Sequence, residues 1–196
     1  MLDALSLRST TFADFGCGTG RHIRHLLERN AGNIVGVDSS LPMLAQGKRK
    51  IPNINVFLLQ CGLERSPFRD GSFDFALAAL VLSHLADIRP SIREFCRLLK
   101  PGGRLIITDL HESFEARGWK RTFNDGASKY AVRNYSHSLD EFHDVFASNG
   151  LALEKESLPL LDEPLRPVFE KTGHIEIFEQ FKNQPLLIVF QVRKKG

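Results

Sequence analysis

A short glycine-rich stretch near the start of the chain carries the residue types that bind nucleotide-like ligands. It reads Asp14-Phe15-Gly16-Cys17-Gly18-Thr19-Gly20. Glycines permit a positive φ and lack the Cβ atom that would keep a ligand away from the backbone. A second carboxylate, Asp38, follows about 20 residues later, at the spacing that binds ribose hydroxyls in α/β folds. These residues predict a site for an adenosine-containing cofactor.

The elements around the glycines are those that position such a site. A β-type run at 10–13 leads into the glycines, an amphipathic helical stretch follows at 21–28, and a second strand-like run at 33–37 ends at Asp38. In this order, backbone N–H groups of the loop and of the helix N-terminus point at the ligand. Later patterns predict strands at 55–59, 73–77, 151–154 and 185–192, a helix at 91–99, and a helix from the capping box 138–141 to about residue 149.

The glycine spacing narrows the choice of cofactor. Dinucleotide-binding folds use Gly-x-Gly-x-x-Gly, whereas here Gly20 comes two residues after Gly18 and is followed by Arg21. The Asp14 carboxylate would repel a pyrophosphate but suits a ligand that carries an ammonium group. S-adenosylmethionine (SAM) carries an ammonium and a sulfonium. The pattern therefore favours SAM, with an NAD-dependent enzyme as an alternative.

Four segments, in this order along the chain, resemble the class I SAM-dependent methyltransferases. They are 14–20, 37–44 (VDSSLPML), 64–74 (ERSPFRDGSFD) and 98–107 (LLKPGGRLII). The similarity is greatest to the small-molecule branch (methyltransferase type 11 domain) that includes ubiquinone and menaquinone methyltransferases, and it extends from about residue 12 to about residue 153. It implies an α/β, Rossmann-like fold: a seven-stranded, mostly parallel sheet with an antiparallel C-terminal hairpin and helices on both faces.

The resemblance also implies a set of cofactor contacts. The methionine part of SAM is expected in the loop 16–20, with its ammonium near Asp14. The ribose hydroxyls are expected at Asp38, and adenine between Met43 and the Leu63 N–H. The full set of predicted cofactor-binding residues is Asp14, Gly16, Cys17, Gly18, Gly20, Asp38, Ser39, Met43, Gly62, Leu63 and Ala78.

Two departures from the family pattern concern the cofactor. Gly62 stands where the family often has an aspartate that accepts a hydrogen bond from the adenine N6 amine. The family also carries one or two helices ahead of the first strand, and residues 1–6 are too short for that lid. We therefore expect an open pocket, a gene start further upstream, or a cap supplied by a partner or by a second copy in a homodimer.

Two variable segments fall where the family builds its acceptor site. The first, about 111–137, holds Trp119 together with tyrosines and arginines; the second, about 159–183, is rich in phenylalanine. Ligands of open α/β sheets bind beyond the carboxyl ends of the strands. The aromatic and arginine content of the first segment suits a flat or anionic small molecule. An ordinary surface excursion with packed aromatics is the alternative.

Methyl transfer from a sulfonium depends mainly on alignment and on exclusion of water. A hydroxyl or acidic-carbon acceptor also benefits from a base, which is usually histidine. We predict His111 as the first candidate for that base and His137 and Tyr135 as the next, with a structural role as the alternative for each. His84 is a further residue that could line the site. No His, Cys or carboxylate spacing is typical of a metal site, so no metal is predicted.

The composition is consistent with a cytoplasmic protein that forms one domain over 1–196. The chain has 196 residues, of which 42% are hydrophobic, and three cysteines; it has no apolar run that could span a membrane and no signal-peptide pattern. The net charge of +3 is mild, and the terminal basic cluster at 193–195 is expected to be a solvated tail. Nucleic acid is not expected as a substrate, because Leu77-Ala78-Ala79-Leu80 replaces the Asn/Asp-Pro-Pro-aromatic motif and no basic stripe with stacking aromatics is visible.

The sequence thus predicts methyl transfer from SAM to a small organic acceptor. O-methylation is slightly favoured over C- or N-methylation, because histidine and tyrosine candidates outnumber acidic ones in the first variable segment. A non-catalytic SAM-binding or interaction protein is the alternative from another class, motivated by the missing lid and by Gly62.

Overall fold

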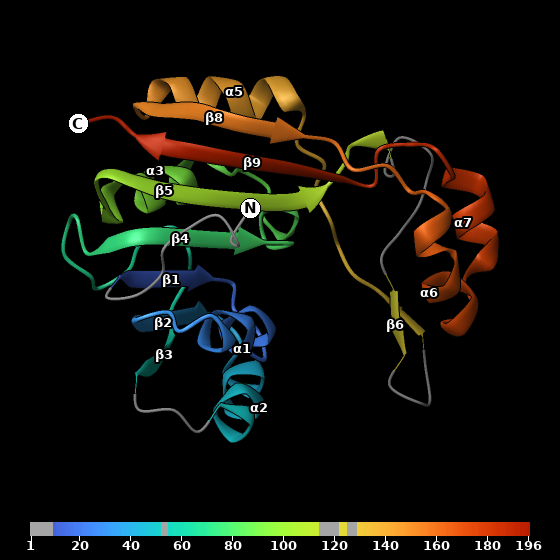
Figure 1. Ribbon diagram of the computed structural model, residues 1–196, viewed down its shortest axis with the longest axis horizontal. Coiled ribbons are helices and arrows are strands. Elements are labelled where there is room, and N and C mark those ends of the chain that lie inside the picture. The colour runs from blue at the N-terminus through green and yellow to red at the C-terminus, as the bar shows by residue number, and fades with distance from the viewer. Residues whose placement is uncertain (1–9, 52–54, 114–121, 125–128) are drawn as a thin grey trace.

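A computed structural model describes residues 10–51, 55–113, 122–124 and 129–196, and for 122–124 and 129–131 it describes the backbone alone. A seven-stranded sheet runs through the molecule in the order β3-β2-β1-β4-β5-β9-β8 (Figure 1). Its strands are β1 (Thr11–Phe15), β2 (Asn33–Asp38), β3 (Val56–Gln60), β4 (Phe73–Ala79), β5 (Leu99–Leu110), β8 (Leu151–Ser157) and β9 (Leu187–Lys194). A separate two-stranded hairpin pairs β6 (Thr122–Asn124) with β7 (Lys129–Ala131).

The sheet is mixed in the way that the sequence predicts. Strands β1 to β5 pair in parallel, whereas β9 runs antiparallel to both β5 and β8. The predicted Rossmann-like fold with an antiparallel C-terminal hairpin is therefore confirmed. The order along the sheet reverses between β1 and β4, and open α/β sheets bind their ligands outside the strand ends at such a point.

Helices cover both faces of the sheet, and alternate residues of each strand bury against them. On one face lie α1 (Arg21–Glu28) and α2 (Leu41–Lys50), and on the other lie α3 (Arg89–Leu98) and α5 (Leu139–Ser148). In β1, Phe12 packs with the apolar residues of α1 and α2, while its neighbour Ala13 packs with those of α3 and α5. This period-2 alternation gives the sheet two separate apolar cores.

The capping box that the sequence predicts at the start of α5 is present in its first half. The Ser138 Oγ accepts a hydrogen bond from the Glu141 N–H at 3.1 Å. The carboxylate of Glu141 instead contacts the ring of His137, with Oε2 and Nδ1 3.1 Å apart. The cap therefore fixes the helix start and also engages one of the predicted catalytic residues.

The second variable segment forms a small lobe beyond the carboxyl edge of the sheet. It contains a short 3₁₀ turn (Glu163–Leu165), α6 (Arg166–Lys171) and α7 (Ile175–Phe181), which stand to one side of the strands in Figure 1. The lobe has its own apolar cluster around Leu161, Phe178 and Phe181. Two adjacent chain segments join it to β8 and β9, through hydrogen bonds such as Leu186 N–H to Pro159 O at 2.8 Å.

Candidate cofactor site

A cavity of about 740 Å³ opens where the carboxyl ends of β1 and β4 diverge. Its size lies within the range of small-molecule sites, and its position is the one that the strand order predicts. The residues that line it are Gly16, Gly18, Asp38, Ser39, Ser40, Met43, Gly62, Leu63, Glu64, Arg65, Leu80, Val81, His84 and Leu85. Segments that follow four different strands therefore meet at one site.

The first glycine of the loop has no room for a side chain. Gly16 has a φ of 73°, and a Cβ atom built there would lie 2.3 Å from Cγ2 of Val81. The loop is also fastened to β2, because the N–H groups of Gly16 and Cys17 both donate to the Val37 carbonyl, at 2.7 and 3.0 Å. Only glycine combines this φ with this close approach, so the loop packs directly against the segment after β4.

Asp38 holds the two sides of the cavity together. Its Oδ2 accepts from the Gly18 N–H and its Oδ1 from the Ser40 N–H, each at 2.8 Å. Ser40 in turn caps α2 by accepting from the Met43 N–H at 3.4 Å. Each carboxylate oxygen can accept a further hydrogen bond. Asp38 can therefore position the loop and still accept bonds from a ligand's hydroxyl groups.

Asp14 is a carboxylate buried behind the glycine loop. It is 1% exposed, and its Oδ2 has no hydrogen-bond partner among the described residues. Burial raises the pKa of Asp14 to about 7, with a further contribution from the nearby Asp38, while Arg21 acts in the opposite direction. An orphaned buried carboxylate behind a glycine-rich loop fits a ligand that brings an ammonium group, as SAM does.

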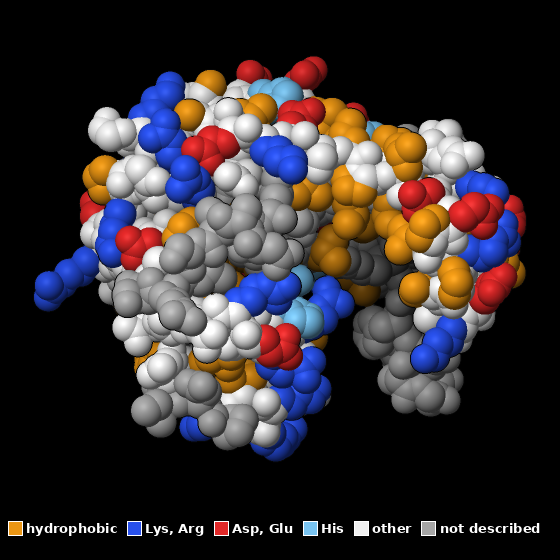
Figure 2. All heavy atoms as spheres, in the orientation of Figure 1, with side chains coloured by type: hydrophobic (Ala, Val, Ile, Leu, Met, Phe, Trp, Pro, Cys, Tyr) orange, Lys and Arg blue, Asp and Glu red, His pale blue; other side chains and the backbone are white. Residues whose placement is uncertain are grey.

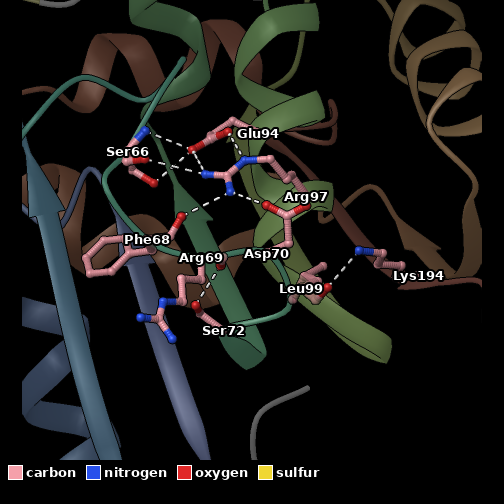
Figure 3. A network of polar contacts seen from close by, with 9 residues as sticks. All are labelled: Ser66, Phe68, Arg69, Asp70, Ser72, Glu94, Arg97, Leu99 and Lys194. Atoms are coloured by element: carbon pink, nitrogen blue, oxygen red, sulfur yellow. Dashed lines mark hydrogen bonds and ion pairs between the residues drawn. The ribbon is translucent and has the colours of Figure 1, made fainter.

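A network of polar contacts fixes the segment that carries the Leu63 side of the cavity (Figure 3). Both the N–H and the hydroxyl of Ser66 donate to Glu94 Oε1 at 2.8 Å, and Arg97 holds the same carboxylate through two of its nitrogens. Burial would raise the pKa of Glu94, but the bonds from Arg97 and Ser66 outweigh it and lower that pKa. Arg97 also donates to the Phe68 carbonyl and to Asp70, so residues 66–70 are tied to α3.

The segment after β4 forms another wall of the cavity. Leu80 adopts a left-handed conformation with a φ of 55°, which is strained for a residue with a branched side chain. The next turn is held by Ser83, whose N–H donates to the buried Asp109 on β5 at 2.9 Å and whose carbonyl accepts from the Tyr135 N–H at 2.7 Å. His84, exposed and part of this turn, lines the cavity as the sequence analysis considered.

The three predicted catalytic residues lie in the described part of the chain but outside the cavity lining. His111 directly follows β5; its Nδ1 accepts from the Ser113 N–H at 3.2 Å, so a neutral His111 carries its proton on Nε2. Tyr135 is half-buried and joined to the Ser83 turn through its backbone. His137 is buried, with Nε2 2.9 Å from the Leu85 carbonyl and Nδ1 against Glu141, an arrangement that suits a structural clamp. Which of them acts as a base stays a prediction.

The cavity brings together many of the predicted cofactor residues but not all. Gly16, Gly18, Asp38, Ser39, Met43, Gly62 and Leu63 line it. Asp14, Cys17, Gly20 and Ala78 are buried beneath its surface. Burial raises the pKa of the Cys17 thiol, as do Asp14 and Asp38, so the sulfur stays a neutral packing group. Trp119 and residues 1–6 lie outside the described residues.

The lining residues that the prediction missed are Ser40, Glu64, Arg65, Leu80, Val81 and Leu85. The rule that ligands bind where the strand order reverses would have indicated 80–85, because these residues directly follow β4.

Among the described residues, no group of three His, Cys, Asp or Glu side chains could hold a metal ion. In the same part of the chain, no helix is long and apolar enough to cross a membrane.

Comparisons with known proteins find similar sequences and folds among methyltransferases. Residues 13–107 match the family described as "Methyltransferase domain". The demethylmenaquinone methyltransferase of Listeria welshimeri is 33% identical over 122 residues, which are 60% of this chain and 51% of that enzyme. The chain therefore spans about half the length of the curated relatives of this kind that it matches.

Solved structures show the same fold. A SAM-dependent methyltransferase from Mesorhizobium loti superimposes with a TM-score of 0.77 at 19% identity, covering 97% of this chain and 93% of that one. A methyltransferase in complex with the Haloferax volcanii Trm112 methyltransferase activator superimposes with a TM-score of 0.75 at 19% identity, covering 100% of this chain and 87% of that one.

The fold and the glycine-lined cavity are those of a Rossmann-like protein, and such folds bind nucleotide-type ligands where the strand order reverses. Residues 13–107 match the methyltransferase-domain family, and the chain is similar in sequence and fold to class I SAM-dependent methyltransferases.

Proposed function

We propose that the protein transfers a methyl group from SAM to a small organic acceptor. The observation that carries the proposal is the pairing of an orphaned buried carboxylate, Asp14, with a loop at Gly16 that admits no side chain. The first provides the counter-charge for an ammonium, and the second keeps the loop packed against Val81, so that the loop and the segment after β4 form adjoining walls of the cavity. SAM, when bound, supplies the electrophilic methyl group.

In this proposal each wall of the cavity has its own part of the cofactor to hold. Asp14 and the loop 16–20 hold the methionine end, and Asp38 with Ser39 accepts the ribose hydroxyls. Met43 and Leu63 flank adenine. The buried Ala78 carbonyl is expected beneath the methionine end, at the end of β4. Charge-assisted hydrogen bonds of the Asp38 kind contribute about 1.5–3 kcal/mol each.

The acceptor is expected between the carboxyl ends of β4 and β5 and the α6–α7 lobe. Hydrophobic side chains gather on the walls of the hollow that separates this lobe from the sheet in Figure 2. Apolar walls exclude water and align an acceptor, which is most of what this reaction needs. His111, at the end of β5 and joined to the lobe by its N–H bond to the Leu186 carbonyl, is placed to act on such an acceptor.

O-methylation remains slightly favoured, because histidine and tyrosine candidates, namely His111, Tyr135 and His137, outnumber acidic ones in the first variable segment and suit a hydroxyl acceptor. A partner or a second copy that caps the cavity belongs to the same proposal. The cavity rim at Leu41 and Met43 is exposed apolar surface, and one structural neighbour was solved in complex with an activator protein.

Isothermal titration calorimetry with SAM, S-adenosylhomocysteine and NADH tests the cofactor, and a screen of hydroxylated aromatic acceptors with SAM follows. Micromolar binding of the first two ligands, with no NADH binding and with methylated product in the screen, is the expected result. NADH binding without SAM binding would refute the proposal. SAM binding without turnover on any acceptor would favour the non-catalytic alternative.

A further inference from the structure

The basic residues of the chain are unevenly distributed. Residues 21–50 contain six Lys and Arg and two acidic residues, Glu28 and Asp38, a net charge of +4. The whole chain has a net charge of +3, so the other 166 residues together carry −1. The sequence analysis considered only the terminal cluster at 193–195 and overlooked this segment, because its charges are spread over two helices.

The fold brings these charges onto one surface. The helices α1 and α2 cover the same face of the sheet, since Ile23, Leu26 and Leu44 share one apolar cluster. Their outward side chains are exposed, and Lys and Arg side chains gather over these helices in Figure 2. We call this surface the basic face; its members are Arg21, Arg24, Lys48, Arg49 and Lys50.

The basic face differs from several other cations of the molecule in how its charges are compensated. Arg97, Arg104 and Arg166 pair with carboxylates of their own neighbourhood. Within the described residues, no ion pair involves any member of the basic face, and Glu28, the acidic residue of α1, pairs with His25. Burial lowers the pKa of His22, and the charges of Arg21 and His25 lower it further, as expected in a positive field.

We propose that the basic face docks the protein on an anionic lipid bilayer. Uncompensated Lys and Arg on a surface of two neighbouring helices attract anionic lipid headgroups. The apolar rim of the cavity adjoins this surface at the N-terminus of α2, where Leu41 is 58% exposed and Met43 is 44% exposed. Contact through the basic face and this rim would place the cofactor cavity beside the headgroups.

A bilayer fits these helices better than a nucleic acid does. Residues 21–50 contain no Phe, Tyr or Trp, so the basic face offers no ring on which a base could stack. The exposed leucine and methionine at its edge instead suit the boundary between headgroups and acyl chains. Nucleic-acid binding is therefore an outcome that the test must separate from the proposed one.

Flotation with large unilamellar vesicles tests the proposal on the full chain. We expect binding to vesicles that contain phosphatidylglycerol and none to pure phosphatidylcholine, with the bound fraction falling as salt rises. The triple variant Arg24→Gln, Lys48→Gln and Lys50→Gln should weaken binding at least tenfold. A matched control, Lys155→Gln, Lys171→Gln and Lys195→Gln, removes three exposed cations from other elements and should change it less than twofold.

Three outcomes would overturn the proposal. They are no vesicle binding by the wild type, equal loss in the two triple variants, and binding of a duplex or single-stranded oligonucleotide that the first triple variant abolishes while vesicles do not bind. S-adenosylhomocysteine affinity should be unchanged in both triple variants, which shows that they fold. Vesicle binding is measured independently of methyl transfer. A failure of the flotation test would therefore leave the proposed function standing.

Discussion

The carboxyl edge of the sheet has two halves that are built in different ways. The cofactor half, formed by the loops after β1, β2, β3 and β4, includes a glycine-rich loop and is held in place by Asp38 and by the Glu94–Arg97 network. The acceptor half, where we expect the acceptor, includes among the described residues 111–113, 132–137 and 159–186, and part of it is a small lobe with its own apolar core. The cofactor half can bind the same ligand in many proteins. The acceptor half can bind a different ligand when its side chains are substituted.

The comparison predicts that the largest effects in the cofactor half come from changes to the backbone. Gly16→Ala places a methyl group 2.3 Å from Val81 Cγ2 at a φ of 73°. Backbone strain costs roughly 1–2 kcal/mol and overpacking about 1–3 kcal/mol more. We expect the free energy of unfolding to fall by about 2–5 kcal/mol, in urea titrations, and S-adenosylhomocysteine binding to be lost in calorimetry.

Gly62→Ala is the matched control, because its Cβ would meet no atom within 4 Å and its φ is not positive. It should leave both the free energy of unfolding and the affinity nearly unchanged. If Gly16→Ala bound the ligand as tightly as the wild type, the cavity would not depend on close approach to the backbone.

Removal of a side chain from the acceptor half should change the rate of turnover and leave the SAM affinity unchanged. His111→Ala is expected to lower the rate of methyl transfer about 10²–10⁴-fold, the usual contribution of a general base. It should leave the SAM affinity unchanged, since His111 does not line the cofactor cavity. His25→Ala, on the exposed side of α1, is the control and should change neither quantity.

A wild-type rate in His111→Ala would remove this residue as the base. Tyr135→Phe and His137→Ala would then be measured in the same way. Because His137 contacts both Leu85 and Glu141, its substitution should also lower the free energy of unfolding, which separates a clamp from a base.

The same contrast explains how much the sequence could predict. The strand and helix signals around Gly16 and Asp38 are local, and the structure places α1 at 21–28 as the pattern predicts. The glycine loop and Asp38 could be predicted from their spacing along the chain, whereas Met43 was implied by the resemblance to the family. These are also the residues that the cavity brings together.

The lining residues that local spacing does not predict depend on contacts between distant segments. Leu80 and Val81 line the cavity because β4 lies beside β1, and Arg65 because Glu94 holds residue 66 from another helix. The polar role of Asp109 likewise depends on a distant neighbour, Ser83. No periodicity along the chain reports such pairings, so the sequence indicates two variable segments without assigning the roles of their residues.

A side chain of the cofactor half should produce a smaller effect than its backbone does. Asp38→Ala removes the acceptor for the ribose hydroxyls and releases the N–H groups of Gly18 and Ser40. The SAM affinity should fall by about 1.5–3 kcal/mol, a factor of about 10–150, in calorimetry. Ser39→Ala should cost far less, and an unchanged affinity in Asp38→Ala would show that another group binds the ribose.

The buried carboxylate should make SAM binding depend on pH. With the pKa of Asp14 raised to about 7, mainly by burial, the free protein must lose a proton to pair with the SAM ammonium below that pH. The affinity should therefore fall about tenfold for each unit below pH 7, and Asp14→Asn should flatten this dependence. A wild-type profile equally flat between about pH 5 and 7 would rule out this linkage.

The same pKa predicts how the stability of the ligand-free protein varies. Because the folded-state pKa of Asp14 lies above its ordinary value of 3.8, the folded chain binds more protons than the unfolded chain between these values. The free energy of unfolding contributed by this group is therefore full below about pH 4 and is lost as the pH rises to 7. Urea titrations of the wild type and of Asp14→Asn across this range would measure the difference.

The smallest expected effect is a gain at Gly62, one of the two departures from the family pattern. Gly62→Asp introduces the carboxylate that relatives use toward the adenine amine, at a position that lines the cavity, is exposed and has open space around its Cβ. One added hydrogen bond contributes about 0.5–1.5 kcal/mol, so SAM should bind roughly two- to tenfold more tightly. Gly62→Asn, which donates as well as accepts, should gain less, and Gly62→Ala should gain nothing. Weaker binding in Gly62→Asp than in Gly62→Ala would mean that adenine lies elsewhere, because a carboxylate gains only where its oxygens meet the amine.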